Sequence, residues 1–428
     1  MEKHFCEYCL TVSYAINSSI IPMQKFTDNQ IHKNITTIAT VSIVKADRYE
    51  YEQVYNAVKR SVELIGGLKA IIKPGSKVFV KINHLSPPTP AEKGIVTNPL
   101  FVEAVLNLLK GLDIDITVGD DLSSYNIDGF LISGFRQMCE KVGVRLTNLR
   151  EGGFVEYKCH GYSLDNVYFS KIVLNADIVV NLPKLKTHSL TTFTGGVKNM
   201  YGVIPGSFRS KYHGDYSNIN EFSQVLVDVY SVIKPHLTIM DAIIAMEGEG
   251  PASGKLRNLG IILSSRDAVA LDAVATSVVG INPKRILTTQ FCNNRQLGVG
   301  NINQIEIVGE KIADVSVADF KPPLAFTSLF ISGIPSYLPK FLIKHLAVVP
   351  HIIEKNCTGC SECETICPTG AITVTNRKAA INKDSCIDCM CCHEVCRFNA
   401  IVPRRSIIGI LFHSGSTIVN ILRSLSSR

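Results

Sequence analysis

The chain of 428 residues lacks several features that would place it in a broad class. Residues 322–339 and 406–422 carry no charge, but prolines interrupt the first and the second is short for a bilayer, so no membrane span is predicted. No secretory signal is visible, and disulfides are therefore not expected. The net charge of +7 forms no dense basic stripe, which argues against nucleic-acid binding. We expect a cytoplasmic protein.

The common phosphate-binding signatures are also missing. The chain has no P-loop, and no G-x-G-x-x-G stands between a strand and a helix. Its hydrophobic fraction of 46% and charged fraction of 19% are typical of a globular protein. The length allows two or three domains, the largest with a sizeable core.

Cysteine, in contrast, is concentrated in one segment. Nine of the 14 cysteines lie between Cys357 and Cys396. The other five are scattered, as expected for reduced thiols in the cytosol. Two of them form a lone C-x2-C without a partner pair, which is a weak signal for a metal or redox role. These five are Cys6, Cys9, Cys139, Cys159 and Cys292.

Eight cysteines of the dense segment form two copies of one motif. In each copy three cysteines are spaced C-x2-C-x2-C and a fourth follows after three residues. This is the spacing of bacterial two-cluster ferredoxins, in which the fourth cysteine of each run ligates the other cluster. We therefore predict two 4Fe–4S clusters. The predicted ligands are Cys357, Cys360, Cys363 and Cys396 for the first cluster, and Cys386, Cys389, Cys392 and Cys367 for the second.

The repeat extends beyond the cysteines, because residues 367–372 align with residues 396–401 and suggest two halves related by a pseudo-twofold. Zinc would instead favour four ligands per ion, commonly as paired C-x2-C knuckles. The spacing makes the ninth cysteine, Cys391, a non-ligand. Residues 354–403 carry five basic and six acidic side chains, and each oxidised cluster with its thiolates adds about −2, so this segment should be acidic when loaded.

The longer part of the chain alternates between short apolar runs and helical periodicity. This alternation predicts an α/β layered domain with a mainly parallel sheet, and the cysteine segment predicts a small α+β ferredoxin-like domain behind it. Asn98 is a plausible N-cap before Pro99. We expect strands at 41–44, 77–82, 114–118, 176–182, 237–240, 259–263 and 305–308, and helices at 51–65, 99–110, 129–142, 219–233 and 268–279.

Polar residues follow five of the expected strands. Ligands bind outside the carboxyl ends of strands in open parallel sheets, so we expect these residues to share one edge and form a site. The alternative is the ordinary polarity of loops. The five groups are Lys81 and Asn83; Gly119, Asp120 and Asp121; Pro183, Lys184, Lys186 and His188; Asp241, Glu247 and Glu249; and Ser264, Ser265, Arg266 and Asp267.

The segment from 182 to 202 is the densest of these groups. Gly195 and Gly196 would permit a ligand to approach the backbone closely, and three lysines supply positive charge. We therefore predict an anionic ligand such as a phosphate or carboxylate. A purely structural His188 and a solvated turn at Glu247 remain alternatives. The catalytic or binding candidates are Lys184, Lys186, His188, Lys198, Asn199, Asp241 and Glu247.

Several of these motifs together resemble the domain of unknown function 362 family, whose members are often fused to ferredoxin domains in anaerobic bacteria and archaea. The resemblance spans roughly residues 38–310, and the lysine-rich segment is its most specific part. It implies one cytoplasmic redox protein and no particular reaction. The motifs are at 80–83, 97–99, 119–120, 182–188, 194–199, 240–241, 247–251 and 266–272.

We accordingly divide the chain into an extension at 1–36, an α/β domain at 37–320, a linker or arm at 321–350, a two-cluster domain at 351–403 and a C-terminal helix at 404–428. The last segment either packs on the body or contacts anionic lipid peripherally.

Three functions stay open at this point. The first is an iron–sulfur electron-transfer protein with a redox partner protein. The second is a cluster-dependent reductase, an oxidoreductase that acts on an anionic molecule held in the α/β domain. The third is a docking or assembly module of a redox complex.

Overall fold

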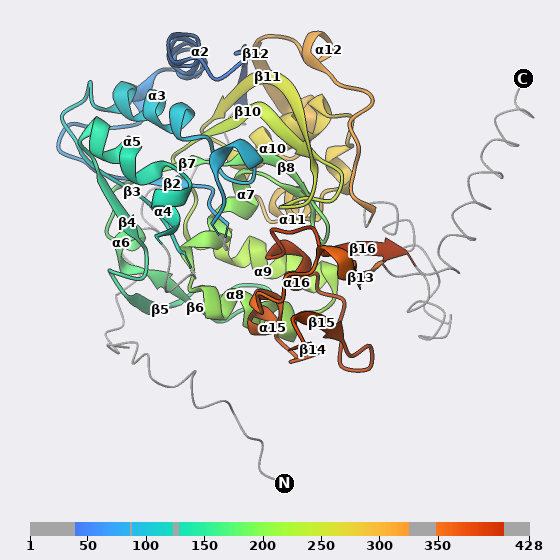
Figure 1. The fold of residues 1–428 in the computed structure, drawn as a ribbon. Coiled ribbons are helices and arrows are strands. Elements are labelled where there is room, and N and C mark those ends of the chain that lie inside the picture. The colour runs from blue at the N-terminus through green and yellow to red at the C-terminus, as the bar shows by residue number, and fades with distance from the viewer. Residues whose placement is uncertain (1–38, 86–87, 123–127, 325–347, 406–428) are drawn as a thin grey trace, which may run out of the picture.

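The computed structural model describes residues 39–85, 88–122, 128–324 and 348–405, which form a large α/β domain and a smaller cysteine-rich module packed against it (Figure 1). The expected extension at 1–36 lies outside the described residues, and so does most of the expected linker at 321–350. Of the expected C-terminal helix, Arg404 and Arg405 are described, and they belong to a strand. The rest of that helix lies outside the described residues.

A ten-stranded sheet forms the centre of the α/β domain. Its strands pair in parallel, except that β11 runs antiparallel to both neighbours and β9 runs antiparallel to β8. The mainly parallel α/β fold predicted from the sequence is confirmed. The main path is β12 (Ile305–Gly309), β1 (Ala39–Lys45), β11 (Lys255–Ser265), β10 (Leu237–Glu247), β7 (Ile178–Leu182), β2 (Lys77–Ile82), β3 (Asp115–Asp120) and β4 (Arg145–Asn148), with β8 (Lys184–His188) beside β10 and β9 (Thr192–Thr194) beside β8.

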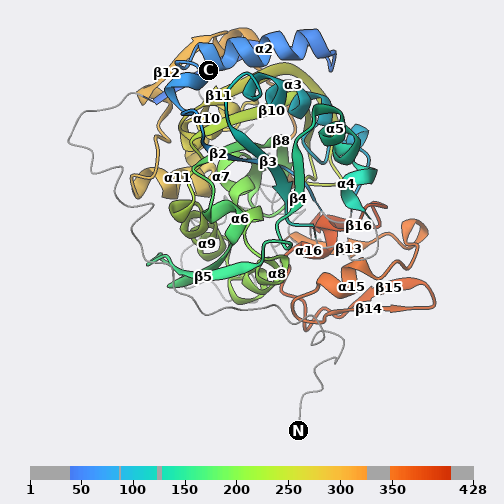
Figure 2. The ribbon, with the colours of Figure 1, turned by 90° about the vertical axis from the view of Figure 1, so that its left-hand side faces the viewer.

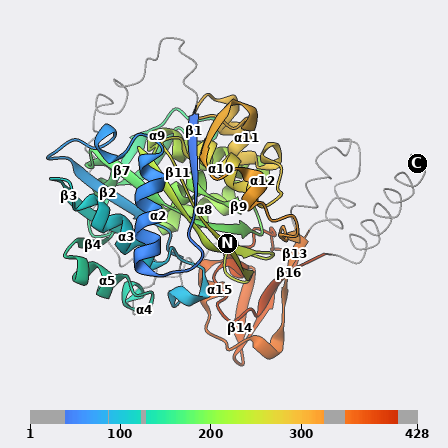
Figure 3. The ribbon, with the colours of Figure 1, turned by 90° about the horizontal axis from the view of Figure 1, so that it is seen from above.

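Alternate residues of the central strands enter cores on opposite faces of the sheet. In β2, Val78 and Val80 pack into one core and Phe79 into the other, as the two-residue period of a strand requires. Helices cover both faces, so the domain has three layers (Figure 3). One face carries α2 (Tyr51–Glu63), α3 (Pro99–Leu109) and α5 (Phe135–Val142), and the other carries α7 (Gly196–Asn199), α9 (Ile219–Val232), α10 (Ala268–Val278) and α11 (Leu287–Asn294).

The expected elements are largely present, with informative differences. Asn98 caps α3 by accepting a hydrogen bond from the Leu100 amide, as predicted. The helix expected at 129–142 is broken, because Gly134 adopts φ +83° between α4 (Gly129–Ile132) and α5. The shorter elements outside the main sheet are β5 (Phe154–Lys158), β6 (Asn166–Ser170), α6 (Lys171–Leu174), α8 (Gly206–Asp215) and α12 (Ile312–Val315).

The cysteine-rich module is built from two similar halves. Its first strand pairs antiparallel with its last, so the two cysteine runs are brought together. The paired strands reach from residue 348 to residue 405, slightly beyond the expected 351–403. The elements are β13 (Val348–Ile352), α15 (Glu362–Ile366), β14 (Ile372–Thr375), β15 (Lys378–Ile381), α16 (Cys391–Glu394) and β16 (Ile401–Arg405).

The module is attached by one side. Figures 1 and 2 show α16 on the side that faces the α/β domain and the β14–β15 hairpin on the side that faces away. Of the helices α15 and α16, α16 is therefore the one that faces the larger domain.

Candidate functional site

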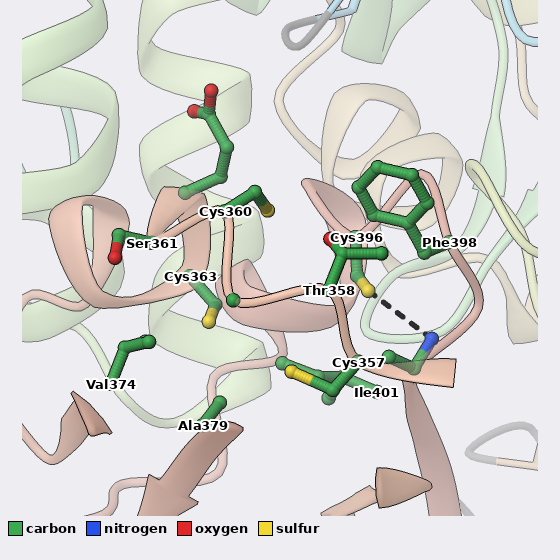
Figure 4. Close-up of a pocket in the computed structure, with 13 residues that line it drawn as sticks. Cys357, Thr358, Cys360, Ser361, Cys363, Val374, Ala379, Cys396, Phe398 and Ile401 are labelled. Carbon is green, nitrogen blue, oxygen red and sulfur yellow. Dashed lines mark hydrogen bonds between the residues drawn. The ribbon is translucent and has the colours of Figure 1, made fainter. Parts of the chain in front are cut away.

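Four cysteines from both runs surround a first pocket in the module (Figure 4). Cys357, Cys360 and Cys363 come from the first run, and Cys396 comes from the end of the second. Their sulfurs face a common space beside Ile401. Cys360 is exposed, so this pocket borders solvent.

A second pocket contains the other four cysteines of the repeat. Cys386, Cys389 and Cys392 come from the second run, and Cys367 comes from the end of the first. The ninth cysteine, Cys391, is buried in the wall of the same pocket. Each pocket is thus completed by the fourth cysteine of the other run.

Equivalent backbone features shape both pockets. The amide of Ala371 donates to the Sγ of Cys367 at 3.2 Å, and the amide of Ala400 donates to the Sγ of Cys396 at 3.2 Å. Amide donors of this kind stabilise a thiolate and tune a bound cluster. Left-handed residues recur at matching places, so the two runs turn alike: Gly359 and Asp388, Ser361 and Met390, and Gly370 and Asn399. The donor set and its crossed arrangement fit a 4Fe–4S cluster in each pocket.

The lysine-rich segment is a buried strand and not the loop expected from the sequence. Every residue of β8 is buried, because the strand lies in parallel beside β10. Two lysines and a histidine alternate with apolar or small residues, so hydropathy gives little sign of a strand here. The strand expected at 237–240 also runs on to Glu247, so the expected loop residues Asp241 and Glu247 lie within β10.

Lys184 is held in a closed network. Its Nζ lies 2.8 Å from Asp241 and donates to the hydroxyl of Tyr49 at 2.5 Å, while that hydroxyl donates to Asp241 at 2.8 Å. Burial lowers the pKa of Lys184, and the Asp241 carboxylate opposes the shift. Both side chains are almost wholly buried. This pair can support the neighbouring strands, but each charged group already has its partner.

The other basic residues of β8 are Lys186 and His188. Lys186 donates to the carbonyl of Ile95 at 2.6 Å, and burial together with the nearby Lys198 lowers the pKa of Lys186 to about 7. The Nδ1 of His188 accepts from the amides of Leu190 and Thr191 at 3.2 and 3.4 Å. Because Nδ1 is an acceptor, the proton of the neutral imidazole is on Nε2. Burial holds the pKa of His188 well below its usual value, which keeps the ring neutral.

The carboxylate that faces this basic site belongs to the cysteine-rich module. Oε1 of Glu394, in α16, lies 3.2 Å from Nε2 of His188. Burial raises the pKa of Glu394, and Lys198 and Lys186 oppose the shift. The distance is short, but the two atoms are not aligned as a hydrogen bond, and neither has another hydrogen-bond partner among the described residues. We define Lys186, His188, Lys198 and Glu394 as the seam site.

Asn199 and the start of α7 have a structural function in this arrangement. Nδ2 of Asn199 donates to Asn181 at 2.7 Å, and its Oδ1 accepts from Asn83 at 2.9 Å, so the amide links two strand ends. Asp272 accepts from the amides of Gly196 and Val197 at 2.6 and 3.0 Å. Burial raises the pKa of Asp272 to about 7, and these amides oppose the shift. The contacts fix the short helix that carries Lys198.

Four of the five expected polar groups meet at one edge of the sheet. Lys81 binds Asp120 at 2.7 Å between β2 and β3, and the Asn199 amide joins the ends of β2 and β7. The fifth expectation is wrong. Because β11 is antiparallel to β10, its end at Ser265 lies at the opposite edge. There Asp267 caps α10 by accepting from the amides of Val269 and Ala270.

Glu247, at the end of β10, lies at the shared edge, where its Oε2 accepts from the amide of Lys321 at 3.2 Å.

The sequence interpretation missed Glu394 and His393. A signal was present, because these residues stand between the last two cysteines where the first copy has Glu364 and Thr365. The two copies differ at the positions where the second copy contacts the α/β domain.

The first cysteine run belongs to a recognisable class, since residues 350–373, which contain it, match the 4Fe-4S binding domain model. The chain is an iron–sulfur protein with an electron-transfer role. Residues 78–277 match the model for Domain of unknown function (DUF362). The chain is 31% identical over 253 residues, 59% of its length, to a thylakoid-associated protein of Synechocystis sp., of which it covers 78%. It belongs to the DUF362 family, here joined to a 4Fe–4S domain.

Two further relatives match shorter stretches of the chain. The chain is 42% identical over 56 residues to one component of an ion-translocating oxidoreductase complex of Methanosarcina acetivorans, which is 13% of this chain and 21% of that protein. It is 28% identical over 113 residues to one component of the H2:CoB-CoM heterodisulfide,ferredoxin reductase of Methanothermobacter marburgensis, which is 22% of this chain and 17% of that protein. Both matches thus span about a fifth of the relative.

Among solved structures, a lactate racemase apoprotein from Thermoanaerobacterium thermosaccharolyticum aligns at 13% identity and a TM-score of 0.38, over 56% of this chain and 57% of that one.

Within the described part of the chain, none of the helices combines the length and apolar character that a membrane crossing needs.

Proposed function

We propose that the chain is an electron-transfer protein that carries two 4Fe–4S clusters, one in each cysteine-lined pocket. The observation that carries this proposal is the crossed arrangement, in which Cys396 completes the first pocket and Cys367 completes the second. Each cluster, when bound, would supply a centre that accepts and releases one electron. The cysteines would hold the irons, and the amides of Ala371 and Ala400 would stabilise the bound sulfurs.

Iron and sulfide analysis after anaerobic purification tests the proposal. We expect about eight irons per chain in the wild type, and about four in Cys363→Ser with the α/β domain still folded. Cys396→Ser should remove the same electron paramagnetic resonance signal as Cys363→Ser, because the ligands are crossed. Cys391→Ser is the matched control, and its iron content should be unchanged. Unchanged iron in Cys363→Ser, or loss in Cys391→Ser, would contradict the ligand assignment.

A redox partner protein is part of this proposal. Two of the relatives are components of redox complexes by name, which supports a partner of that kind. The exposed Cys360 places the first pocket where a partner could approach. We also propose that the protein acts in the cytoplasm.

A second candidate is a reductase that binds a small anion at the seam site. It is favoured by His188 Nε2 and Glu394 Oε1, buried polar atoms without a hydrogen-bond partner among the described residues. A ligand with both an acceptor and a donor could satisfy both. Thermal-shift measurements with inorganic phosphate, which has both a donor and acceptors, test this candidate, and acetate serves as an anion with acceptors alone. A rise in melting temperature that is lost in Lys186→Ala would support it, and no rise with either anion would oppose it.

A further inference from the structure

The module contacts the α/β domain through residues that directly follow a cysteine of the second pocket. In α16, Cys392 lines the pocket while His393 and Glu394 meet the α/β domain. The imidazole of His393 lies between the carbonyls of Ile401, at 2.8 Å, and Glu249, at 3.2 Å. One short helix thus holds a wall of the pocket and the attachment at once.

A second contact reaches the same pocket from another direction. A Cβ added at Gly214, in α8, would lie 3.0 Å from the Cβ of Pro368. Pro368 follows Cys367, the cysteine that the first run contributes to the second pocket. The α/β domain therefore approaches the second pocket both at α16 and at the turn after Cys367.

The surface that receives α16 has more positive than negative charge. Lys184 and Lys81 are each paired with an aspartate, whereas the carboxylate that acts most strongly on both Lys186 and Lys198 is that of Glu394, which forms an ion pair with neither. Lys186 stands two residues before His188 in β8, and Nε2 of His188 lies 3.2 Å from Oε1 of Glu394 in α16, the helix that carries Cys392. Lys186 is buried and Lys198 is half-buried, so solvent and salt screen their charge less than that of an exposed lysine.

The first pocket has a different cation. Lys378, an exposed residue of the module itself, donates to the carbonyls of Glu354 and Cys357 at 2.7 and 2.9 Å. Because Lys378 is exposed, water and salt screen its charge much more strongly than that of a buried lysine.

We propose that Lys186 and Lys198 of the α/β domain form the countercharge for the second cysteine site. The α/β domain then sets the redox potential of the second site, whereas the module alone sets the redox potential of the first. This proposal rests on the proposed function, since it needs a cluster in each pocket. A cluster becomes more negative when it is reduced, and a nearby buried cation stabilises the more negative state. The two lysines therefore raise the midpoint potential of the second site.

A redox titration of the loaded, full-length protein, followed by electron paramagnetic resonance, tests the proposal. The variants Cys360→Ser and Cys389→Ser assign the two midpoints to the first and second sites. We expect Lys198→Met to lower the second midpoint and leave the first in place, and Lys198→Arg to restore it. Lys378→Met is the matched control, and it should lower the first midpoint by a smaller amount.

The outcomes separate this proposal from the proposed function. If Lys198→Met leaves both midpoints in place, or lowers them equally, the proposal is overturned while two-cluster binding stands. If the wild type holds fewer than two clusters, the proposed function fails before any midpoint is compared. A change in the hydrogen exchange of α16 in Lys198→Met without a shift in the second midpoint would also overturn the proposal, because it would show attachment without control of potential.

Discussion

Helices α15 and α16 occupy equivalent places in the repeat, but their side chains form different contacts. In α15, Glu364 accepts from the amide of Val374 at 3.2 Å and Thr365 donates to the carbonyl of Ser361 at 3.1 Å, both inside the module. In α16, His393 and Glu394 contact the α/β domain instead. The cysteines therefore define the two pockets, while the residues between the cysteines determine which pocket is attached to the larger domain.

The largest expected difference between the two sites is in attachment. Cys389→Ser and Cys360→Ser should each cost about half of the bound iron. Because α16 forms part of the second pocket, only Cys389→Ser should also loosen α16 and its contact with β8. Hydrogen exchange of the full chain, read in α16 and β8, measures this. Equal exchange in both variants would show that the two halves of the module are attached alike.

A smaller effect is expected at the left-handed turns. Gly370 has φ +62°, and a Cβ there would meet nothing within 4 Å, so only backbone conformation restricts the residue. Asn399 adopts φ +52° at the equivalent place. We expect Gly370→Asn to keep the second cluster. Gly370→Val should weaken it, because the left-handed conformation costs an ordinary residue about 1–2 kcal/mol and a β-branched one more.

The rate at which an iron chelator removes iron measures this difference, with Asn399→Val as the counterpart at the first site. Fast loss from Gly370→Asn would show that asparagine cannot replace glycine here and that the two turns are not equivalent.

The smallest effect is a pH dependence confined to the second site. The pKa of Lys186 is lowered to about 7, and the charged groups that act on it are Lys198, Glu394, Lys184 and Asp120. Below pH 7 the amine of Lys186 is protonated, and its positive charge should raise the midpoint potential of the second site. As pH rises through 7 the proton is lost and the midpoint should fall. Redox titrations from pH 6 to pH 8 should show this slope in the wild type and not in Lys186→Met, whereas the same slope in both would assign it to another group.

Much of the fold could be predicted from the sequence. The strand at 77–82 and the capped helix from Pro99 follow from local pattern, and both are present. Strand β8 could not be predicted in this way, because Lys184 and Lys186 are buried only through partners supplied by other strands and loops. The direction of β11 could not be predicted either, since no local property of its residues states which neighbour it pairs with.

The candidate site divides along the same line. The cysteine spacing is a short-range property, and the sequence alone predicted which cysteines line each pocket. That two iron–sulfur clusters fill the pockets stays a prediction. The anionic partner of the lysine-rich segment was expected to be a separate molecule. In the structure Glu394 of the same chain faces the segment, and the bound anion stays a proposal.

The cysteine pattern, the turns that shape it and the alternation of strands and helices all follow from local sequence, because each depends on residues close together in the chain. The position of the second cysteine site against the α/β domain, in contrast, depends on how distant parts of the chain pack. That contact joins residues such as Glu249 and His393, 144 positions apart. Contacts of this kind form only once the module and the α/β domain have packed together. Burial in the packed structure also strengthens the electrostatic interaction between charged side chains that are far apart in the sequence.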